Sequence, residues 1–189
     1  RIVTIEDSYE LGLDKYEELH PDHDCLQARL ANTEGQGEVT LADLTRMALR
    51  MDPDRVLVGE VRGAEAFPML LAMSQGNNGS MCTMHADSAR SVFPKLAAYM
   101  SMASTGVPTE TLNLLVSSAV HYVIHLANHQ GRRRVESIHE VAGSEGAAII
   151  SNEVYSAGGS IEPFAALTHS GALLLDDHGF RSRRELVWS

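Results

Sequence analysis

The chain has 189 residues, of which 44% are hydrophobic and 21% charged, proportions that are typical of a soluble globular protein. Its formal net charge of −10 disfavours broad binding to the phosphodiester backbone of nucleic acids. No apolar run approaches the roughly 18 to 20 residues that are needed to cross a bilayer. The two cysteines, Cys25 and Cys82, form no disulfide or CxxC pattern, which favours a reducing cytoplasm.

The first expected elements are a strand and a helix separated by an acidic loop. Residues 1–5 are rich in β-branched side chains and predict a strand that ends at the acids Glu6 and Asp7. Thr40-Leu-Ala-Asp43 has the form of a capping box with Asp in the usual Glu place, and it predicts the start of an amphipathic helix. Pro53 marks the end of that helix.

The next expected elements again alternate between strand and helix. Residues 55–59 predict a compact apolar strand that delivers Glu60 at its carboxyl end. Residues 64–75 have a helical pattern that stops at a glycine. Residues 80–84 predict another strand, and it ends at His85.

The rest of the chain predicts two helices and then three strands. The helices carry apolar residues at helical spacing, and the strands are expected near 121–126, 134–142 and 149–155. Alternating strands and helices indicate the α/β class, with helices on both faces of a sheet. In such sheets function gathers at the carboxyl ends of the strands, where Glu6, Glu60 and His85 are expected.

Arg55-Val-Leu-Val-Gly-Glu-Val-Arg-Gly63 has the form of a Walker B element, an apolar strand that ends in an acid. In P-loop ATPases that acid holds magnesium or polarises the attacking water. The pattern alone is weak, because many buried strands end in a solvated glutamate.

Three segments in order carry a resemblance to a known family: Thr4-Ile-Glu-Asp-Ser-Tyr-Glu-Leu11, Val58-Gly-Glu-Val-Arg-Gly63 and Gly79-Ser-Met-Cys-Thr-Met-His-Ala86. They resemble the acidic box, Walker B box and histidine box of the type II/type IV secretion ATPase superfamily, most closely its tight-adherence (Flp-type) pilus branch. Residues 31–40 and 48–55 also look like this branch. The resemblance is good over roughly residues 1–140 and loose beyond about 145.

The resemblance implies roles for seven residues. Glu6 corresponds to the catalytic glutamate that activates water, with Asp7 and Glu10 in support. Glu60 corresponds to the Walker B acid, and His85 to the box histidine near the γ-phosphate. Arg29 corresponds to an arginine that neutralises phosphate charge, for which a permanently charged guanidinium is well suited. Arg62 follows the Walker B acid, as the family leads one to expect, and is associated with the nucleotide and Mg²⁺.

Each role has a structural alternative. The acids at strand ends could simply be solvated, and His85 could be a hydrogen-bonding residue beside a turn. Arg29 lies in a variable loop. Arg62 could instead pair with a nearby acid, Glu60 or Glu65, and serve the fold.

The sequence departs from the family in one respect, since it contains no Gly-x-x-x-x-Gly-Lys-[Ser/Thr] loop to cradle phosphate. The closest stretch, Glu34-Gly-Gln-Gly37, has no lysine. The chain also begins on Arg1 rather than Met. We therefore expect a C-terminal fragment, truncated at its N-terminus, that is inactive alone.

The expected architecture is a RecA-like α/β P-loop ATPase domain over residues 1–142, followed by a β-rich C-terminal extension over 143–189. The resemblance implies a hexameric enzyme that hydrolyses ATP with Mg²⁺ and couples hydrolysis to pilin assembly or protein export. Its implied partners are ATP, further copies of itself and inner-membrane platform proteins. The implied location is cytoplasmic, peripherally on the inner face of the membrane, with no transmembrane segment and no nucleic acid.

Two other functions stay open: a catalytically silent scaffold subunit of the same fold, and a DNA-translocating conjugation-type ATPase. The nine histidines include clusters at 20–24 and 121–129, but neither matches a known zinc spacing. No metal is expected in the protein apart from Mg²⁺ with ATP. The arginines at 132–134 are interpreted as a solvated turn.

Overall fold

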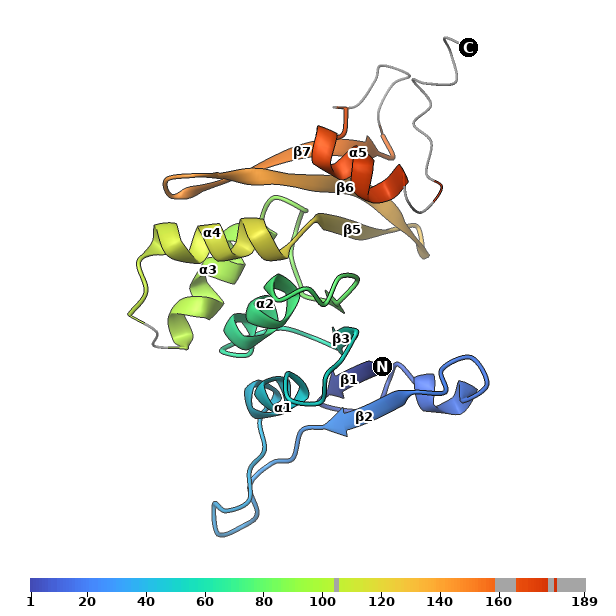
Figure 1. The fold of residues 1–189 in the computed structure, drawn as a ribbon, viewed down its shortest axis with the longest axis vertical. Helices are drawn as coiled ribbons and strands as arrows, with labels where there is room; N and C mark the ends of the chain where they lie inside the picture. The colour runs from blue at the N-terminus through green and yellow to red at the C-terminus, as the bar shows by residue number, and fades with distance from the viewer. Residues whose placement is uncertain (104–105, 159–165, 177–178, 180–189) are drawn as a thin grey trace.

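The computed structural model describes residues 1–103, 106–158, 166–176 and 179. A parallel sheet has the strand order β2-β1-β3-β4, and an antiparallel sheet has the order β5-β6-β7. In Figure 1 the parallel sheet occupies the lower part of the molecule and the antiparallel sheet the upper part, with α3 and α4 between them. The α/β class predicted from the sequence is confirmed.

The parallel sheet and its helices follow the chain in regular alternation. The strands are β1 (Ile2–Glu6), β2 (His23–Gln27), β3 (Arg55–Val58) and β4 (Met81–Cys82). The helices are the 3₁₀ helix η1 (Leu13–Tyr16), α1 (Leu41–Ala48), α2 (Ala66–Ser74), α3 (Val92–Met102) and α4 (Thr109–Ala119).

The core lies between this sheet and the helices. Successive side chains of a strand point to opposite faces, so Val3 and Ile5 of β1 share a face with Val56 and Val58 of β3, with which they pair in register. All four are at most 2% exposed. Helices α1 and α2 contact this face, and α4 contacts α2 in turn. Burial of these β-branched side chains therefore fixes the register of β1 against β3, and with it the alignment of their carboxyl ends.

Helix α1 begins where the sequence predicted. The Thr40 hydroxyl accepts the N–H of Asp43 at 3.1 Å, and the Asp43 carboxylate accepts the N–H of Thr40 at 3.2 Å. These reciprocal bonds satisfy donors that a helix N-terminus leaves unpaired. The Thr40 hydroxyl also donates to the Asp43 carboxylate at 2.7 Å, and this bond is the chief cause that holds the pKa of Asp43 below its usual range, followed by the bond from the Thr40 N–H.

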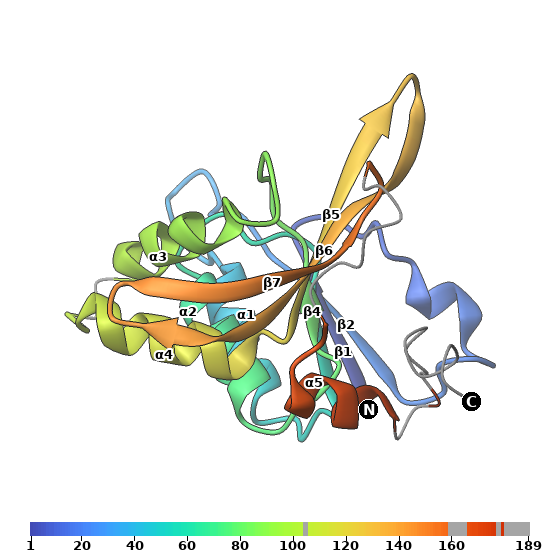
Figure 2. The same ribbon diagram turned by 90° about the horizontal axis from the view of Figure 1, so that it is seen from above.

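The opposite face of the parallel sheet is covered differently from our expectation. Helices α1 to α4 all lie on one side of it, and η1 lies on the other, as Figures 1 and 2 agree. On that side Thr4 is buried, and its hydroxyl lies 3.3 Å from the Nε2 of His23. Within the described residues, helices longer than one turn cover only one face.

The antiparallel sheet consists of β5 (Tyr122–His129), β6 (Arg132–Glu145) and β7 (Ala148–Ser156). Its strands match the three predicted ones but are longer. The boundary that we placed between residues 142 and 143 falls inside β6, which pairs with both β5 and β7. The β5–β6 hairpin projects from the body of the molecule (Figure 2). A short helix, α5 (His169–Asp176), follows the sheet.

Helix α5 is attached to the antiparallel sheet by a buried carboxylate. Glu140 of β6 is 3% exposed and accepts the N–H of Thr168 at 2.8 Å and its hydroxyl at 2.6 Å. Thr168 in turn accepts the N–H of Gly171 at 3.0 Å, as an N-cap does. No helix in the described part of the chain is both long and apolar enough to cross a membrane.

Candidate active site

The ends of β1, β3 and β4 lie side by side at the carboxyl edge of the parallel sheet. Pairing continues past the strands, because Gly59 donates its N–H to the Ile5 carbonyl at 2.9 Å and Val61 donates to the Thr83 carbonyl at 2.8 Å. This pairing sets the acids after β1 and β3 and the histidine after β4 on neighbouring positions. Parallel strands deliver their carboxyl ends to one edge, which is where ligands bind in open α/β sheets.

Four predicted site residues form a continuous chain of charged contacts at this edge. The guanidinium of Arg62 bonds the Asp7 carboxylate, and its other terminal nitrogen lies 3.9 Å from an oxygen of Glu60. The second oxygen of Glu60 lies 3.4 Å from the Nε2 of His85. The side chain of Glu60 is 35% exposed and that of His85 is 93% exposed, so both are open to a ligand from solvent.

Glu6 is placed differently, although it is the last residue of its strand. It is 3% exposed, and one of its oxygens accepts the backbone N–H groups of Glu10 and Leu11, each at 2.9 Å. The carboxylate therefore closes the loop that follows β1. Glu10 enters the site through this backbone N–H.

A glycine makes room for Glu6. A Cβ on Gly59 would lie only 3.1 Å from the Cγ of Glu6, closer than side-chain carbons ordinarily approach. The Gly in the Walker-B-like stretch thus has a local steric role, because it lets two neighbouring strand ends carry acids.

Arg29 does not join the cluster. Its Nε donates to the Gly37 carbonyl at 2.7 Å, and its backbone forms an isolated bridge with Val39. Within the described residues these contacts hold the loop before α1. A role at the phosphate stays a prediction for this arginine.

Three further residues outside the predicted set shape the site, and Glu65 is the first of them. Glu65 is 8% exposed, and one of its oxygens accepts the backbone N–H groups of Arg62 and Gly63 at 2.5 and 2.8 Å. It thereby holds the turn that aims the Arg62 side chain. Its position three residues after Arg62 is the spacing of a side-chain cap, a signal that was available in the sequence.

Helix α3 also reaches the site. Lys95 donates its ammonium to the carbonyl of His85 at 2.7 Å, and the Thr83 hydroxyl bonds the Gly59 carbonyl at 2.5 Å. These two contacts fix the backbone on either side of the histidine. Neither residue carries a sequence signal for this role, because both contacts depend on how distant segments meet.

The cluster combines groups that suit a magnesium–phosphate ligand. Carboxylate oxygens such as those of Glu60 and Asp7 are the ligands Mg²⁺ prefers, and the ion usually keeps waters and phosphate oxygens as its other ligands. In the described part of the chain, no three His, Cys, Asp or Glu side chains are grouped to hold a metal by themselves.

Comparison with known families places the whole of this region in one group of proteins. A family model described as "Type II/IV secretion system protein" matches residues 1–167, which include every predicted site residue. The chain belongs to this family.

Relatives within the type II/IV secretion family support that assignment. A putative conjugal transfer protein of Mycobacterium tuberculosis is 40% identical over 147 residues, which are 77% of this chain and 40% of the relative. VirB11, a type IV secretion system protein of Brucella suis, is 36% identical over 139 residues, or 71% of this chain and 37% of that protein.

A solved structure agrees with the fold. The VirB11 ATPase of the Brucella suis type IV secretion system, crystallised with sulphate, superposes with a TM-score of 0.62 at 31% identity. The match covers 74% of this chain and 40% of that one. The chain thus spans about 40% of the length of the relatives that it matches. The predicted membership of the secretion ATPase superfamily is confirmed.

Proposed function

We propose that this chain is the C-terminal part of a motor ATPase that hydrolyses Mg²⁺-ATP as a hexamer and drives pilin assembly or protein export. The observation that carries the proposal is the placement of Glu60. It follows a buried parallel strand, it is open to solvent, and each of its oxygens faces a different cationic or titratable side chain. Family membership over residues 1–167 supports the same reading.

In this proposal Glu60 binds the hydrated magnesium ion, and Arg62 and His85 meet the phosphate oxygens. An acid on a rigid strand suits the first role, because the nucleophile and the ion must be placed within a fraction of an ångström. Arg62 suits the second because its guanidinium grips oxygen atoms in pairs. The contacts among the three also hold them ready when no ligand is bound.

Glu6 is the proposed water activator. One of its oxygens is occupied by two backbone N–H groups, and within the described residues no hydrogen bond engages the other. That second oxygen is the one that would accept a proton from water. The same bonds fix the carboxylate against rotation, which is the positioning that general-base chemistry needs.

The residues present fit part of the nucleotide. The carboxyl edge offers groups for Mg²⁺ and the terminal phosphate, while no stretch of the sequence has the glycine-rich, lysine-containing form that cradles the β- and γ-phosphates. We infer that this loop belongs to an upstream segment and that the present chain alone turns over no ATP. Assignment to the Flp pilus branch, and attachment to the inner face of the membrane, are parts of the same proposal.

The test is Mg²⁺-dependent ATP turnover by the chain extended upstream through its native reading frame. The extended protein should be active, the present chain inactive, and Glu60→Gln in the extended protein at least about tenfold slower, or roughly 1.4 kcal/mol in the barrier. The matched control is Glu38→Gln, an exposed glutamate in the loop before α1. It removes the same charge and should leave turnover unchanged.

Two outcomes would replace the proposal. Inactivity of the extended protein at concentrations that form rings would favour the scaffold subunit. Stimulation of turnover by DNA would favour the conjugation-type translocase, a function in line with the description of the Mycobacterium tuberculosis relative as a putative conjugal transfer protein. The net charge of −10 opposes it.

A further inference from the structure

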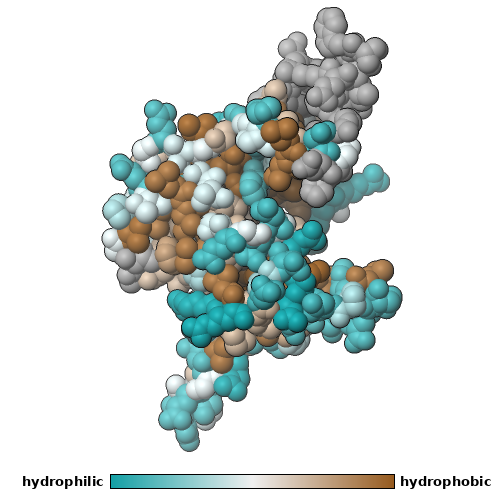
Figure 3. Space-filling model, viewed as in Figure 1, coloured by the Kyte–Doolittle hydropathy of each residue, from teal (hydrophilic) through white to brown (hydrophobic). Residues whose placement is uncertain are grey.

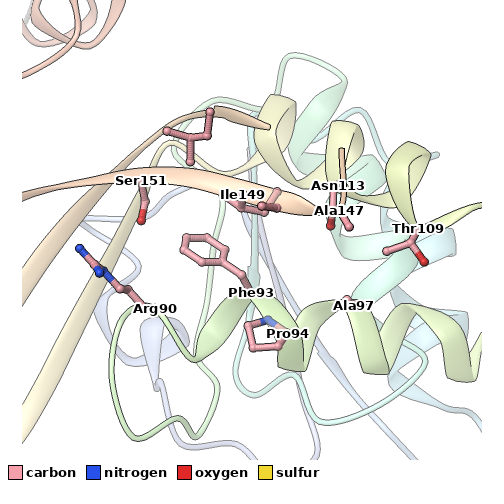
Figure 4. Close-up of a pocket in the computed structure, with 11 residues that line it drawn as sticks. Arg90, Phe93, Pro94, Ala97, Thr109, Asn113, Ala147, Ile149 and Ser151 are labelled. Carbon is pink, nitrogen blue, oxygen red and sulfur yellow. The ribbon is translucent and has the colours of Figure 1, made fainter. Parts of the chain in front are cut away.

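A pocket of about 620 Å³ lies away from the carboxyl edge, between helices α3 and α4 and the β6–β7 hairpin. This volume is within the range of roughly 300–1,000 Å³ that small-molecule sites occupy. None of the predicted site residues lines it. Figure 4 shows Arg90 at one end, Phe93 and Ile149 in the middle, and Thr109 and Asn113 at the other end.

The middle of the pocket is apolar. The ring of Phe93 lies between Ile149 of β7 above and Pro94 below, and Ala97 sits one turn further along α3 (Figure 4). Phe93 is half-buried, Ala97 is small, and about 620 Å³ of the pocket is open. The surface of this region is also rich in hydrophobic residues over α3 and α4, whereas the η1 loop is mostly hydrophilic (Figure 3). A planar apolar group would gain about 25 cal/mol for each Å² that it buries there.

One end of the pocket carries an unpaired positive charge. Arg90 is exposed, and within the described residues no hydrogen bond or ion pair occupies its guanidinium. Ser151 lies beside it, with its hydroxyl 3.3 Å from the Nδ1 of His139. Burial lowers the pKa of His139, the charge of Glu153 raises it, and the charge of Arg90 lowers it. Among the described residues that line the pocket, Arg90 is the one with a permanent positive charge.

The other end offers neutral polar groups. Asn113 is 4% exposed, and the only partner of its amide nitrogen in the described residues is the Gly146 carbonyl at 3.4 Å, a long bond. The Thr109 hydroxyl lies at the same end (Figure 4). A buried amide with a weak partner favours a ligand that can accept a better hydrogen bond.

We propose that this pocket binds a small anionic amphiphile, a molecule with a planar apolar body and one acidic group. The acidic group bonds Arg90, the body lies on Phe93 under Ile149, and the far end meets Asn113. The charge complementarity of Arg90 selects an anion over a neutral molecule of the same shape, because a guanidinium pairs with carboxylate, sulfonate or phosphate oxygens. This site is separate from the proposed ATP chemistry and does not depend on it.

The probe is 8-anilinonaphthalene-1-sulfonate, which has the required planar body and a single sulfonate, titrated against the chain by fluorescence. N-phenyl-1-naphthylamine, which lacks the sulfonate, is the matched neutral probe. The anionic probe should bind saturably at one site. Arg90→Gln should weaken it about tenfold and leave the neutral probe unchanged, because only the charge contact is lost.

Two further variants complete the design. Ala97→Phe places a ring in the floor and should abolish binding of both probes. Arg46→Gln removes a charge from the exposed face of α1 and should change neither. Circular dichroism confirms that each variant is folded. The proposal is wrong if binding is not saturable, if Arg90→Gln affects both probes equally or neither, or if folded Ala97→Phe binds as the wild type does.

Discussion

The carboxyl ends of β1 and β3 are neighbours in the same sheet and both deliver a glutamate, yet they place it in opposite environments. Glu6 is 3% exposed and bonds two backbone N–H groups, whereas the Glu60 side chain is 35% exposed and meets Arg62 and His85. The two acids look alike in the sequence. The difference teaches that backbone donors fix one strand-end acid in a buried position, whereas the other, which has no such donors among the described residues, stays open to solvent.

The difference arises because Glu6 is itself the last residue of its strand, whereas one residue, Gly59, separates Glu60 from the end of β3. Glu6 is the last residue of β1, it pairs with Gln27 of β2, and on its other side it lies against Gly59, just beyond the end of β3. Glu60 comes after Gly59, beyond the last residue that pairs in β3, so it leaves the sheet and reaches solvent. Gly59 also gives Glu6 its space. The two sites are therefore coupled through a single glycine.

The strongest test of this comparison measures the free energy of unfolding of two variants, Glu6→Ala and Glu60→Ala. Loss of the Glu6 carboxylate removes two charge-assisted bonds and should lower the free energy of unfolding by about 3 kcal/mol. Glu60→Ala should change it by less than about 0.5 kcal/mol, as exposed positions usually do. Thermal unfolding followed by circular dichroism should show a fall of several degrees for the first variant alone.

Glu6→Gln distinguishes the hydrogen bonds from the charge. Its amide oxygen can still accept both N–H groups, so its stability should lie between those of the wild type and Glu6→Ala. Equal melting temperatures for Glu6→Ala and Glu60→Ala would contradict the assignment of Glu6 as the anchor of the loop.

The two cysteines extend the contrast to the two faces of the sheet. Cys82 packs against the core, and burial raises the pKa of its thiol to about 11. Cys25 lies on the other face, beside His23 and a pocket with Asp14 and Glu17. Because the thiolate is the reactive form, Cys82 should react with Ellman's reagent at pH 8 at least about a hundredfold more slowly than an unperturbed thiol.

Cys25→Ser and Cys82→Ser each leave one thiol and so assign the two rates. Denaturant should bring both cysteines to the same fast rate, which controls for reagent access. Rapid reaction of Cys82 in the folded chain would show that the inner face of β4 opens to solvent.

Gly59→Ala tests the coupling of the two strand ends. The added Cβ would stand 3.1 Å from the Cγ of Glu6, so one of the two must shift by a few tenths of an ångström. We expect a loss of about 1–2 kcal/mol in urea unfolding, within the range for overpacking. Gly158→Ala is the control, because its Cβ would meet nothing within 4 Å. In the Glu6→Ala background the effect of Gly59→Ala should largely vanish.

Local sequence signals predicted much of this fold. Strand β3 was predicted from a short apolar run, Val56-Leu57-Val58, that ends at Gly59. Helix α1 was predicted from the reciprocal capping residues Thr40 and Asp43, and the structure has both bonds. Such features depend on residues a few positions apart, so the sequence alone contains their cause.

Other elements were missed because their cause is tertiary. Strand β2 reads His-Asp-Cys-Leu-Gln, with no β-branched residue, and it forms a strand through pairing with β1. Strand β4 is shorter than the predicted 80–84. Arg62 lies 3.9 Å from Glu60, one of the two acids predicted as its partner, but its hydrogen bond goes to Asp7, 55 positions away. The sequence predicted which residues lie at the strand ends but not which of them bond one another.

Arg62→Gln should give the smallest change in stability and so separates fold from function at this edge. The Arg62 side chain is 59% exposed, and the side chain of Asp7, with which it forms an ion pair, is 39% exposed. Such pairs contribute about 0–1 kcal/mol and are screened by salt. Unfolding of the chain should change by less than about 0.5 kcal/mol, and the change should shrink further between 0.01 and 0.5 M salt. If Arg62 serves a phosphate ligand, turnover of the extended protein should nevertheless fall about tenfold. A large loss of stability that is insensitive to salt would instead show that Arg62 stabilises the fold. The exposed carboxyl edge would then have a structural role, as Glu6 has at the buried end of β1.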